Sequence, residues 1–405
     1  MPDKHNLLPR FSTREDVFDY LDGHSVKTAD GLAQRHLTGG VVKTVMLETV
    51  PGSAQMPPLS RVLSLNEMEV DWIDDEVGFV SAPQLGTRPF GIVELMATRH
   101  LAVYTLLKSD VAARVLNPLV RTNPWVDRLW LSAPMFERLW ERVEATSHPN
   151  RYTRLKFDHE AFFEVSDDDP DLGSDVDSDL DEGELDEAPD DRRASSFTLV
   201  DRVSTIREKL PVLQDAYRPL ESLVQLRIPA AGRGGHDFYF DGRVTNRSDS
   251  FYDHRSNVRD VVDLYRRTTE ASENALWLES SIEPHVAFRG AALTIRFSER
   301  LADQTFERWL DSTFTRHGRF RLSGRVFRTG PTRAQIAAID RHLWQTLQME
   351  VSATGITALV PAGTCGNTVH RLITNIQRFL DPAVQAWLGS ASYDEVVGAS
   401  FRGAA

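Results

Sequence analysis

The stretch EVSDDDPDLGSDVDSDLDEGELDEAPDD, residues 164–191, decides how this chain is organised. It contains fifteen Asp and Glu residues and no Lys, Arg or His. Such a dense run of like charge, with only scattered Val and Leu, cannot bury enough apolar surface to offset the entropy lost on ordering. We therefore expect residues 164–194 to form a disordered acidic linker that divides the chain in two.

The charge of the chain is concentrated in this tract. The formal net charge is −13, so the residues outside the tract together carry +2. Residues 192–405 contain 28 Lys and Arg against 23 Asp and Glu, which makes the second half mildly basic. Two interpretations follow: the tract is a solvated spacer, or it occupies a basic surface on its own chain or on a partner. A tether would hold it near the second half at roughly millimolar effective concentration.

The sequence on either side of the tract predicts an α+β fold in two mixed lobes. Residues 1–163 form the expected N-terminal α+β domain, and residues 195–405 form a C-terminal α+β domain with a further division near 282. The longest apolar stretch, residues 90–107, contains Glu94, which is costly at a bilayer centre. We interpret this stretch as a buried helix and expect no membrane span.

Helical periodicity in the second half predicts helices over residues 203–216, 251–276, 333–347 and 368–380. Strands are expected between them, including a hairpin over residues 319–328.

That hairpin lies in an arginine cluster without acidic neighbours. If Ser323 and Gly324 form a two-residue turn, the alternation of side chains places three guanidinium groups on one surface, with a helix N-terminus following at Arg333. We predict an anion-binding surface formed by Arg319, Arg321, Arg328 and Arg333, with Arg316 and Arg325 as supporting charge.

Several Arg side chains on a rigid sheet suit a phosphate backbone or an acidic peptide. The alternative is a solvated sheet face whose Arg residues pair with acids from elsewhere in the fold. The ligand stays open, because the acidic tract, an acidic protein segment and a nucleic acid all fit.

A second candidate is the Gly-containing loop of residues 361–371, which places Cys365 and Arg371 in a C-x5-R spacing. The spacing resembles that of the cysteine-dependent phosphatases, in which a thiol of lowered pKa attacks phosphate while an Arg clamps the oxyanion. The sequence departs from that family because Leu372 follows the Arg and no general-acid Asp is evident. The alternative is a tight turn between a strand and a helix with a buried Cys.

Other kinds of site have little support. The sequence contains no H-E-x-x-H and no paired Cys motif, so we expect no metal and no cofactor. Because Cys365 is the single Cys, no internal disulfide is possible, which fits a reducing cytosol. The first residues show no apolar run of signal-peptide length, so we expect a cytoplasmic protein.

These observations favour a non-enzymatic interaction or regulatory protein. Its Arg-rich C-terminal surface would bind an acidic protein segment or a nucleic acid, with the acidic linker modulating access to it. Two alternatives are kept: a phosphatase-like enzyme using Cys365 and Arg371, and a structural subunit of a larger assembly. In each case we expect the chain to be part of a complex or to act on an anionic substrate.

Overall fold

The computed structural model describes residues 7–34, 36, 40–50, 58–160, 194–281, 287–315 and 318–402. Within these ranges the chain forms helices and antiparallel sheets, which confirms the predicted α+β class. Except for Ala194, the predicted linker of residues 164–194 lies outside the described residues, and so does the predicted division near 282.

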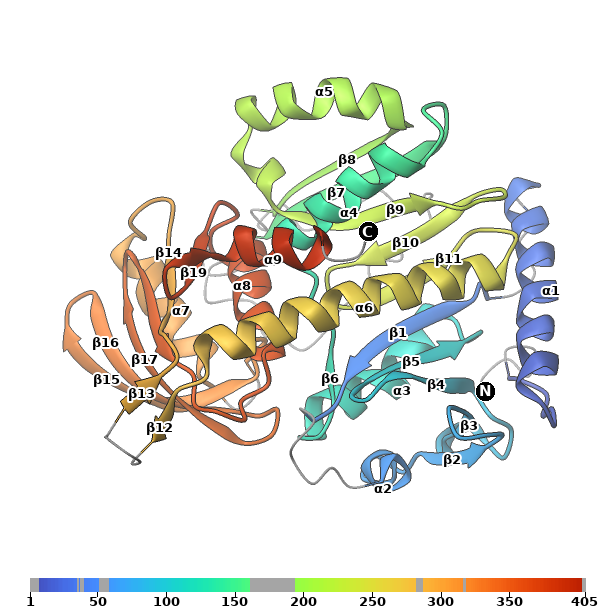
Figure 1. Ribbon diagram of the computed structural model, residues 1–405, viewed down its shortest axis with the longest axis horizontal. Coiled ribbons are helices and arrows are strands. Elements are labelled where there is room, and N and C mark those ends of the chain that lie inside the picture. Colours follow the sequence, from blue (N-terminus) through green and yellow to red (C-terminus); the bar gives the residue numbers. More distant parts are fainter. Residues whose placement is uncertain are drawn as a thin grey trace.

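A large antiparallel sheet dominates the fold (Figure 1). In spatial order its strands are β2 (Glu69–Trp72), β3 (Val77–Ser81), β4 (Gly91–Ala97), β5 (His100–Thr105), β1 (Lys43–Glu48), β11 (Arg243–Asn246), β10 (Gly235–Tyr239), β9 (Leu223–Pro229), β7 (Tyr152–Glu160) and β8 (Ala194–Arg202), with β6 (Asp127–Arg128) paired to β1.

This first sheet contains strands from both sides of the acidic tract. The central strand β1 pairs with β5 on one side and with β11 on the other. Strand β7 pairs with β8 along its whole length, from Tyr152↔Arg202 to Glu160↔Ala194, and with β9 on its other edge. Strands that precede the predicted boundary at 163 and strands that follow the one at 195 therefore belong to the same sheet. The chain divides in space by its two sheets and not at the acidic tract.

Helices cover both faces of the first sheet. They are α1 (Arg14–Ala33), α2 (Leu59–Ser64), α3 (Ser109–Thr122), α4 (Ala133–Thr146), α5 (Val203–Ala216), α6 (Phe251–Leu276) and α9 (Tyr393–Arg402). Along β1, Val45 and Leu47 pack into the cluster with α2 and α3, whereas Met46 packs into the cluster with α1, α4 and α6.

The prediction of a buried helix over residues 90–107 is wrong, because this stretch forms the hairpin of β4 and β5. Apolar side chains on both faces of these strands are buried by the covering helices. Burial on both faces removes the alternation of apolar and polar residues that reveals a strand, and leaves a continuous apolar run.

A second antiparallel sheet forms the other end of the molecule, at the left in Figure 1. Its strands, in spatial order, are β15 (Leu322–Gly330), β16 (Arg333–Asp340), β17 (Gln345–Ser352), β18 (Gly355–Leu359), β14 (Leu293–Arg296), β19 (Gln385–Leu388) and β20 (Ala391–Ser392). Its inner face packs against α7 (Asp303–Thr313) and α8 (Asn367–Phe379). A short pair, β12 (Glu279–Ser281) and β13 (Ala287–Arg289), lies after α6.

In the second half the sequence located most of the helices and the strands between them, but it misassigned one segment as a helix and misplaced one hairpin turn. The predicted helices 203–216 and 251–276 correspond to α5 and α6. The predicted helix 333–347 is wrong, since these residues form β16, a turn and the start of β17. Helix α6 spans the distance between the two sheets in Figure 1, and one hydrophobic cluster runs from the first sheet into the second.

Candidate functional site

The predicted arginine hairpin does not turn at Ser323 and Gly324. Strand β15 passes through both residues and turns only after Gly330, which pairs with Arg333. Ser323 lies opposite Ile339 instead of close to its own chain neighbours. The prediction that a helix begins at Arg333 is also wrong, because Arg333 opens β16.

The four predicted Arg residues consequently separate. Arg328 points to α7, where it pairs with Glu307 and lies 3.3 Å from Asp311. The Arg319 guanidinium lies 4.7 Å from the centre of the Phe379 ring. Of the four, only Arg333 lies on the exposed face of the sheet, where it pairs with Glu350 at 2.6 Å. Arg321 is buried, and the supporting residue Arg316 lies outside the described residues.

The exposed face has a composition of its own. Alternate residues of β16 to β18 are exposed, and so are Arg325 and Phe327 of β15, so nothing in the described part of the chain covers this side. Directly paired residues share a face of a sheet, which places Arg325, Ala337, Gln348 and Leu359 in one row across the four strands. The next row consists of Phe327, Gln335, Glu350 and Thr357. We call these two rows, together with Arg333 and Ile339, the outer face.

The outer face combines positive charge with apolar side chains. Phe327 is 48% exposed, Leu359 43% and Ile339 39%. The Arg325 guanidinium lies 5.1 Å from the centre of the Phe327 ring, which holds a cation over an exposed aromatic surface.

A turn at the end of the outer face exposes a further aromatic residue. Leu343 and Trp344, between β16 and β17, adopt φ values of 65° and 54°. The left-handed region is costly for large side chains, so the surrounding structure must hold this turn in place. The backbone N–H of Leu343 donates to Pro124 O at 2.8 Å, and Trp344 is 60% exposed.

Arg321 and Arg371 meet inside the molecule, at the contact of the two sheets. Both guanidinium groups pair with Asp127 of β6, Arg321 at 2.9 Å. Arg371 also pairs with Asp340 at 2.6 Å and donates from Nε to Phe320 O at 2.9 Å. Burial by itself raises the pKa of Asp127, but these two guanidinium groups hold it well below its ordinary value. We call this group the buried junction. It also includes Cys365, the ion pairs around Glu48 and Arg99, and the buried residues His100, His342 and His370.

The predicted phosphate loop is part of the buried junction and is closed. Cys365 is 1% exposed, and burial followed by the charge of Glu48 raises the pKa of its thiol well above the ordinary value. The thiolate that a phosphatase needs is therefore suppressed. Arg371 is also 1% exposed and uses its nitrogens on Asp127, Asp340 and a backbone carbonyl. This geometry matches the alternative of a tight turn with a buried Cys.

A second set of charges in the buried junction surrounds Glu48 of β1. Arg99 lies between two carboxylates, with its Nε 2.9 Å from Glu48 Oε1 and its Nη1 2.9 Å from Glu273 Oε1. Gly366, at the start of α8, donates its backbone N–H to Glu273 at 2.8 Å. Burial alone would raise the pKa of Glu48, but Arg99 and His100 lower it to about 2. Burial raises the pKa of Glu273 to about 7 against the opposing effect of Arg99.

The buried junction contains neutral histidines. Burial lowers the pKa of His342 to about 4 and that of His370 to about 3. His370 Nδ1 lies 2.7 Å from the Tyr393 hydroxyl. Within the described residues, both ring nitrogens of His100 and of His342 are buried without a hydrogen bond, and Glu48 meets Arg99 as an ion pair whose geometry is not that of a hydrogen bond. The junction thus joins the sheets through compensating charges and holds its titratable groups away from solvent.

Sequence reasoning missed most of this junction. Glu48, Arg99, Asp127, Glu273 and Asp340 are far apart in the chain, and none belongs to a motif. The one available signal was the presence of charged residues inside the apolar stretch 90–107, since a charge within a buried element needs a partner.

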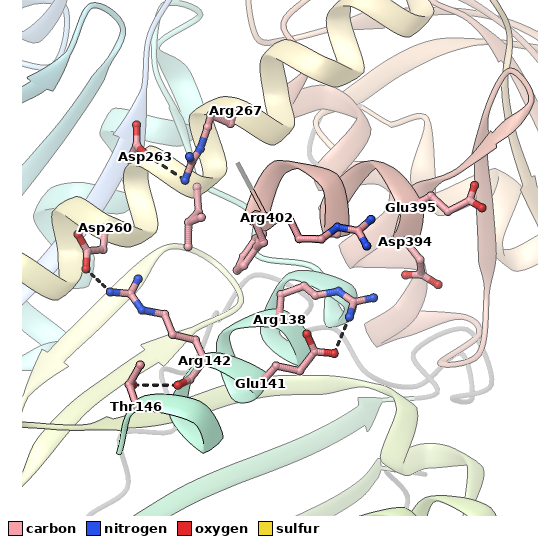
Figure 2. Close-up of a pocket in the computed structure, with 13 residues that line it drawn as sticks. Arg138, Glu141, Arg142, Thr146, Asp260, Asp263, Arg267, Asp394, Glu395 and Arg402 are labelled. Atoms are coloured by element: carbon pink, nitrogen blue, oxygen red, sulfur yellow. Dashed lines mark hydrogen bonds and ion pairs between the residues drawn. The ribbon is translucent and has the colours of Figure 1, made fainter. Parts of the chain in front are cut away.

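A cleft of about 940 Å³ lies between α4, α6 and α9 (Figure 2). Arg142 pairs with Asp260, and Arg267 with Asp263 at 3.2 Å, as the figure shows. Four Arg and five acidic residues line the cleft, so it has no dominant sign of charge: Arg138, Arg142, Arg267, Arg402, Glu141, Asp260, Asp263, Asp394 and Glu395. No residue predicted as a site residue lies in it.

Among the described residues, no group of three or more His, Cys, Asp or Glu side chains is arranged to hold a metal ion. None of the helices described is long and apolar enough to cross a membrane.

The fold and the junction define an α+β protein in which two antiparallel sheets meet through buried ion pairs. The MJECL33-like protein family model matches residues 220–395, a segment that contains α6, the second sheet and α8. Over 401 residues the chain is 20% identical to the protein named "Uncharacterized protein MJECL33" of Methanocaldococcus jannaschii, covering 93% of this chain and 94% of that relative. No solved structure matches the chain.

Proposed function

We propose that this chain is a cytoplasmic, non-enzymatic interaction protein that uses the outer face of its second sheet to bind an anionic partner within a complex. The observation that carries the proposal is the exposure of Arg325, Phe327 and Arg333 on one side of a rigid antiparallel sheet. An uncovered sheet face with apolar and charged residues in alternation is typical of a surface that meets another molecule.

The chemistry of the outer face favours an acidic protein segment as this partner. Carboxylates of such a segment would pair with Arg325 and displace Glu350 from Arg333, while its apolar side chains pack on Phe327 and Ile339. A nucleic acid would use the same guanidinium groups and stack bases on Phe327 and Trp344. Leu359 and Ile339 offer no stacking surface, which favours the protein segment.

Binding of a labelled acid-rich peptide and of a labelled single-stranded oligonucleotide across a salt series tests the proposal. Arg325→Ala and Arg333→Ala should each weaken peptide binding about threefold, as expected for exposed charge pairs of up to about 1 kcal/mol. Arg328→Ala is the matched control, because Arg328 faces α7 and should leave the affinity unchanged. Equal losses in all three variants, or none, would contradict the proposal. Tighter binding of the oligonucleotide, with a steep dependence on salt, would assign the face to nucleic acid.

Modulation by the acidic tract is tested in the same assay. A chain lacking residues 166–191 should bind the peptide more tightly at low salt if the tract competes for the outer face. Unchanged affinity would make the tract a spacer.

A further inference from the structure

The first sheet ends in an edge strand without the usual protection. Strand β8 pairs with β7 on one side, and in the described residues no strand lies on its other side (Figure 1). Its nine residues, ASSFTLVDR, contain no Pro and no Lys, and its register with β7 has no bulge. In natural proteins a Pro, a Lys or a β-bulge on an edge strand commonly prevents it from pairing with another chain.

The described side chains along β8 are exposed or half-buried. Ser196, Phe197, Thr198 and Val200 are exposed, with Phe197 at 37% and Val200 at 52%. Helix α5 follows the strand directly and packs its own apolar residues inward, Val203, Ile206 and Leu210.

The sequence of β8 is complementary to itself in the antiparallel sense. With Thr198 opposite Thr198 of a second copy, Phe197 faces Leu199 and Ser196 faces Val200. Phe197 and Leu199 lie on the side of the strand that pairs with Phe157 and Leu155 of β7, both buried, so the contact would extend the existing core. Asp201 faces Ser195 and Arg202 faces Ala194, so no like charges come together.

The acidic tract selects the antiparallel orientation. The tract carries fifteen negative charges and ends at Asp191, three residues before Ala194, the first residue of β8. Antiparallel pairing places the two attachment points about 25 Å apart, at roughly 3.3 Å per residue, which exceeds the Debye length of about 8 Å at physiological salt. Parallel pairing would bring both tracts to the same end.

We propose that β8 is a homodimerisation edge, at which two copies of this chain join their first sheets across a two-fold axis through Thr198. In such a two-fold dimer the free backbone N–H and C=O groups of β8 pair with those of the second copy. No unpaired edge of β8 is then left to add a third copy. The contact is independent of the outer face, since it lies on the other sheet.

The mass of the native chain, measured by sedimentation equilibrium over a range of concentrations, should show a dimer. Thr198→Lys places two ammonium groups opposite each other and should raise the dissociation constant at least about tenfold, and Thr198→Glu should do the same with carboxylates. A mixture of the two variants should dimerise again, because unlike charges then meet at the axis. Val212→Lys, on the exposed side of α5, is the control and should dimerise normally.

A covalent readout does not depend on these charges. Cys365 is buried, so Thr198→Cys provides the one accessible thiol among the described residues and should form a disulfide-linked dimer under mild oxidation. A native chain that stays monomeric, a Lys variant that dimerises like the native chain, or a mixture without recovery would each overturn the proposal. Unfolding midpoints of the variants close to the native value would show that the loss of dimer is not a loss of fold.

Discussion

At the scale of single residues, Asp127 is the charge on which the contact of the two sheets depends. Its carboxylate is buried and pairs with both Arg321 and Arg371. Removing one member of a buried ionic group leaves the others without compensation, which costs more than the net value of the pair.

Asp127→Asn should therefore lower the free energy of unfolding by about 3–5 kcal/mol, measured by urea denaturation. Glu350→Gln removes an exposed carboxylate from Arg333 and should change stability by less than about 1 kcal/mol. Similar effects of the two substitutions would mean that the junction does not hold the sheets together.

Buried histidines make stability depend on pH. Burial lowers the pKa of His342 to about 4, that of His370 to about 3, and that of His254 well below its ordinary value. Below a pH of about 6.5 the unfolded chain binds protons at these rings and the folded chain does not, so stability falls as pH decreases. Each ring contributes up to about 1.4 kcal/mol per pH unit. Glu273, with its pKa raised to about 7, acts in the opposite direction between roughly pH 4.5 and 7 and offsets part of this loss.

Unfolding midpoints measured at pH 7, 6 and 5 should accordingly decrease. His342→Leu should make that decrease shallower, because it removes one buried proton acceptor. The native chain, measured at the same three pH values, is the reference for this comparison. A pH dependence that His342→Leu does not alter would contradict the neutral, buried state of this ring.

At the scale of elements, the sequence predicted α6 correctly but assigned the residues of β16 to a helix, and both outcomes have physical reasons. Helix α6 has an N-cap at Ser250, whose side chain accepts from Asp253 N, and polar and apolar faces that differ along its 26 residues. Strand β16 carries Ala, Gln and Ile on its exposed positions, residues that do not distinguish a strand from a helix.

The face of the second sheet on which each side chain of β15 lies depends on where the hairpin of β15 and β16 turns. Because β15 turns after Gly330 and not at Ser323, Phe327 lies opposite Gln335 on the outer face; the face of a side chain is set by the register of its strand. The sequence correctly indicated extended structure within the Arg-rich residues 319–328, but the hairpin turn that it predicted at Ser323 and Gly324 is wrong. Arg321 adopts a φ of 54° just before β15, and it reaches the Val126 and Asn123 carbonyls, residues about 195 positions away in the chain. Such a contact has no local signal.

At the scale of the whole molecule, the acidic tract is inserted between two paired strands and does not separate two sheets. The two residues that flank the segment containing the tract lie beside each other, since Glu160 of β7 pairs with Ala194 of β8. The buried junction also joins residues from both sides, such as Asp127 and Arg371. Composition alone could show the tract and its charge, but not the sheet that continues across it.

Separate expression of residues 1–163 and 194–405 distinguishes a single sheet shared across the tract from two independent domains joined by the tract. The first fragment would leave β1 without β11 and β7 without both of its neighbours, so it should not fold alone. The second would lack β1 and β7, and Arg371 would have lost Asp127. Coexpressed fragments should copurify and unfold together, because a cut in the tract breaks one covalent connection and lowers the effective concentration of the two parts. The intact chain is the reference for the unfolding midpoint. Cooperative unfolding of residues 1–163 alone would show instead that the tract joins two independent domains.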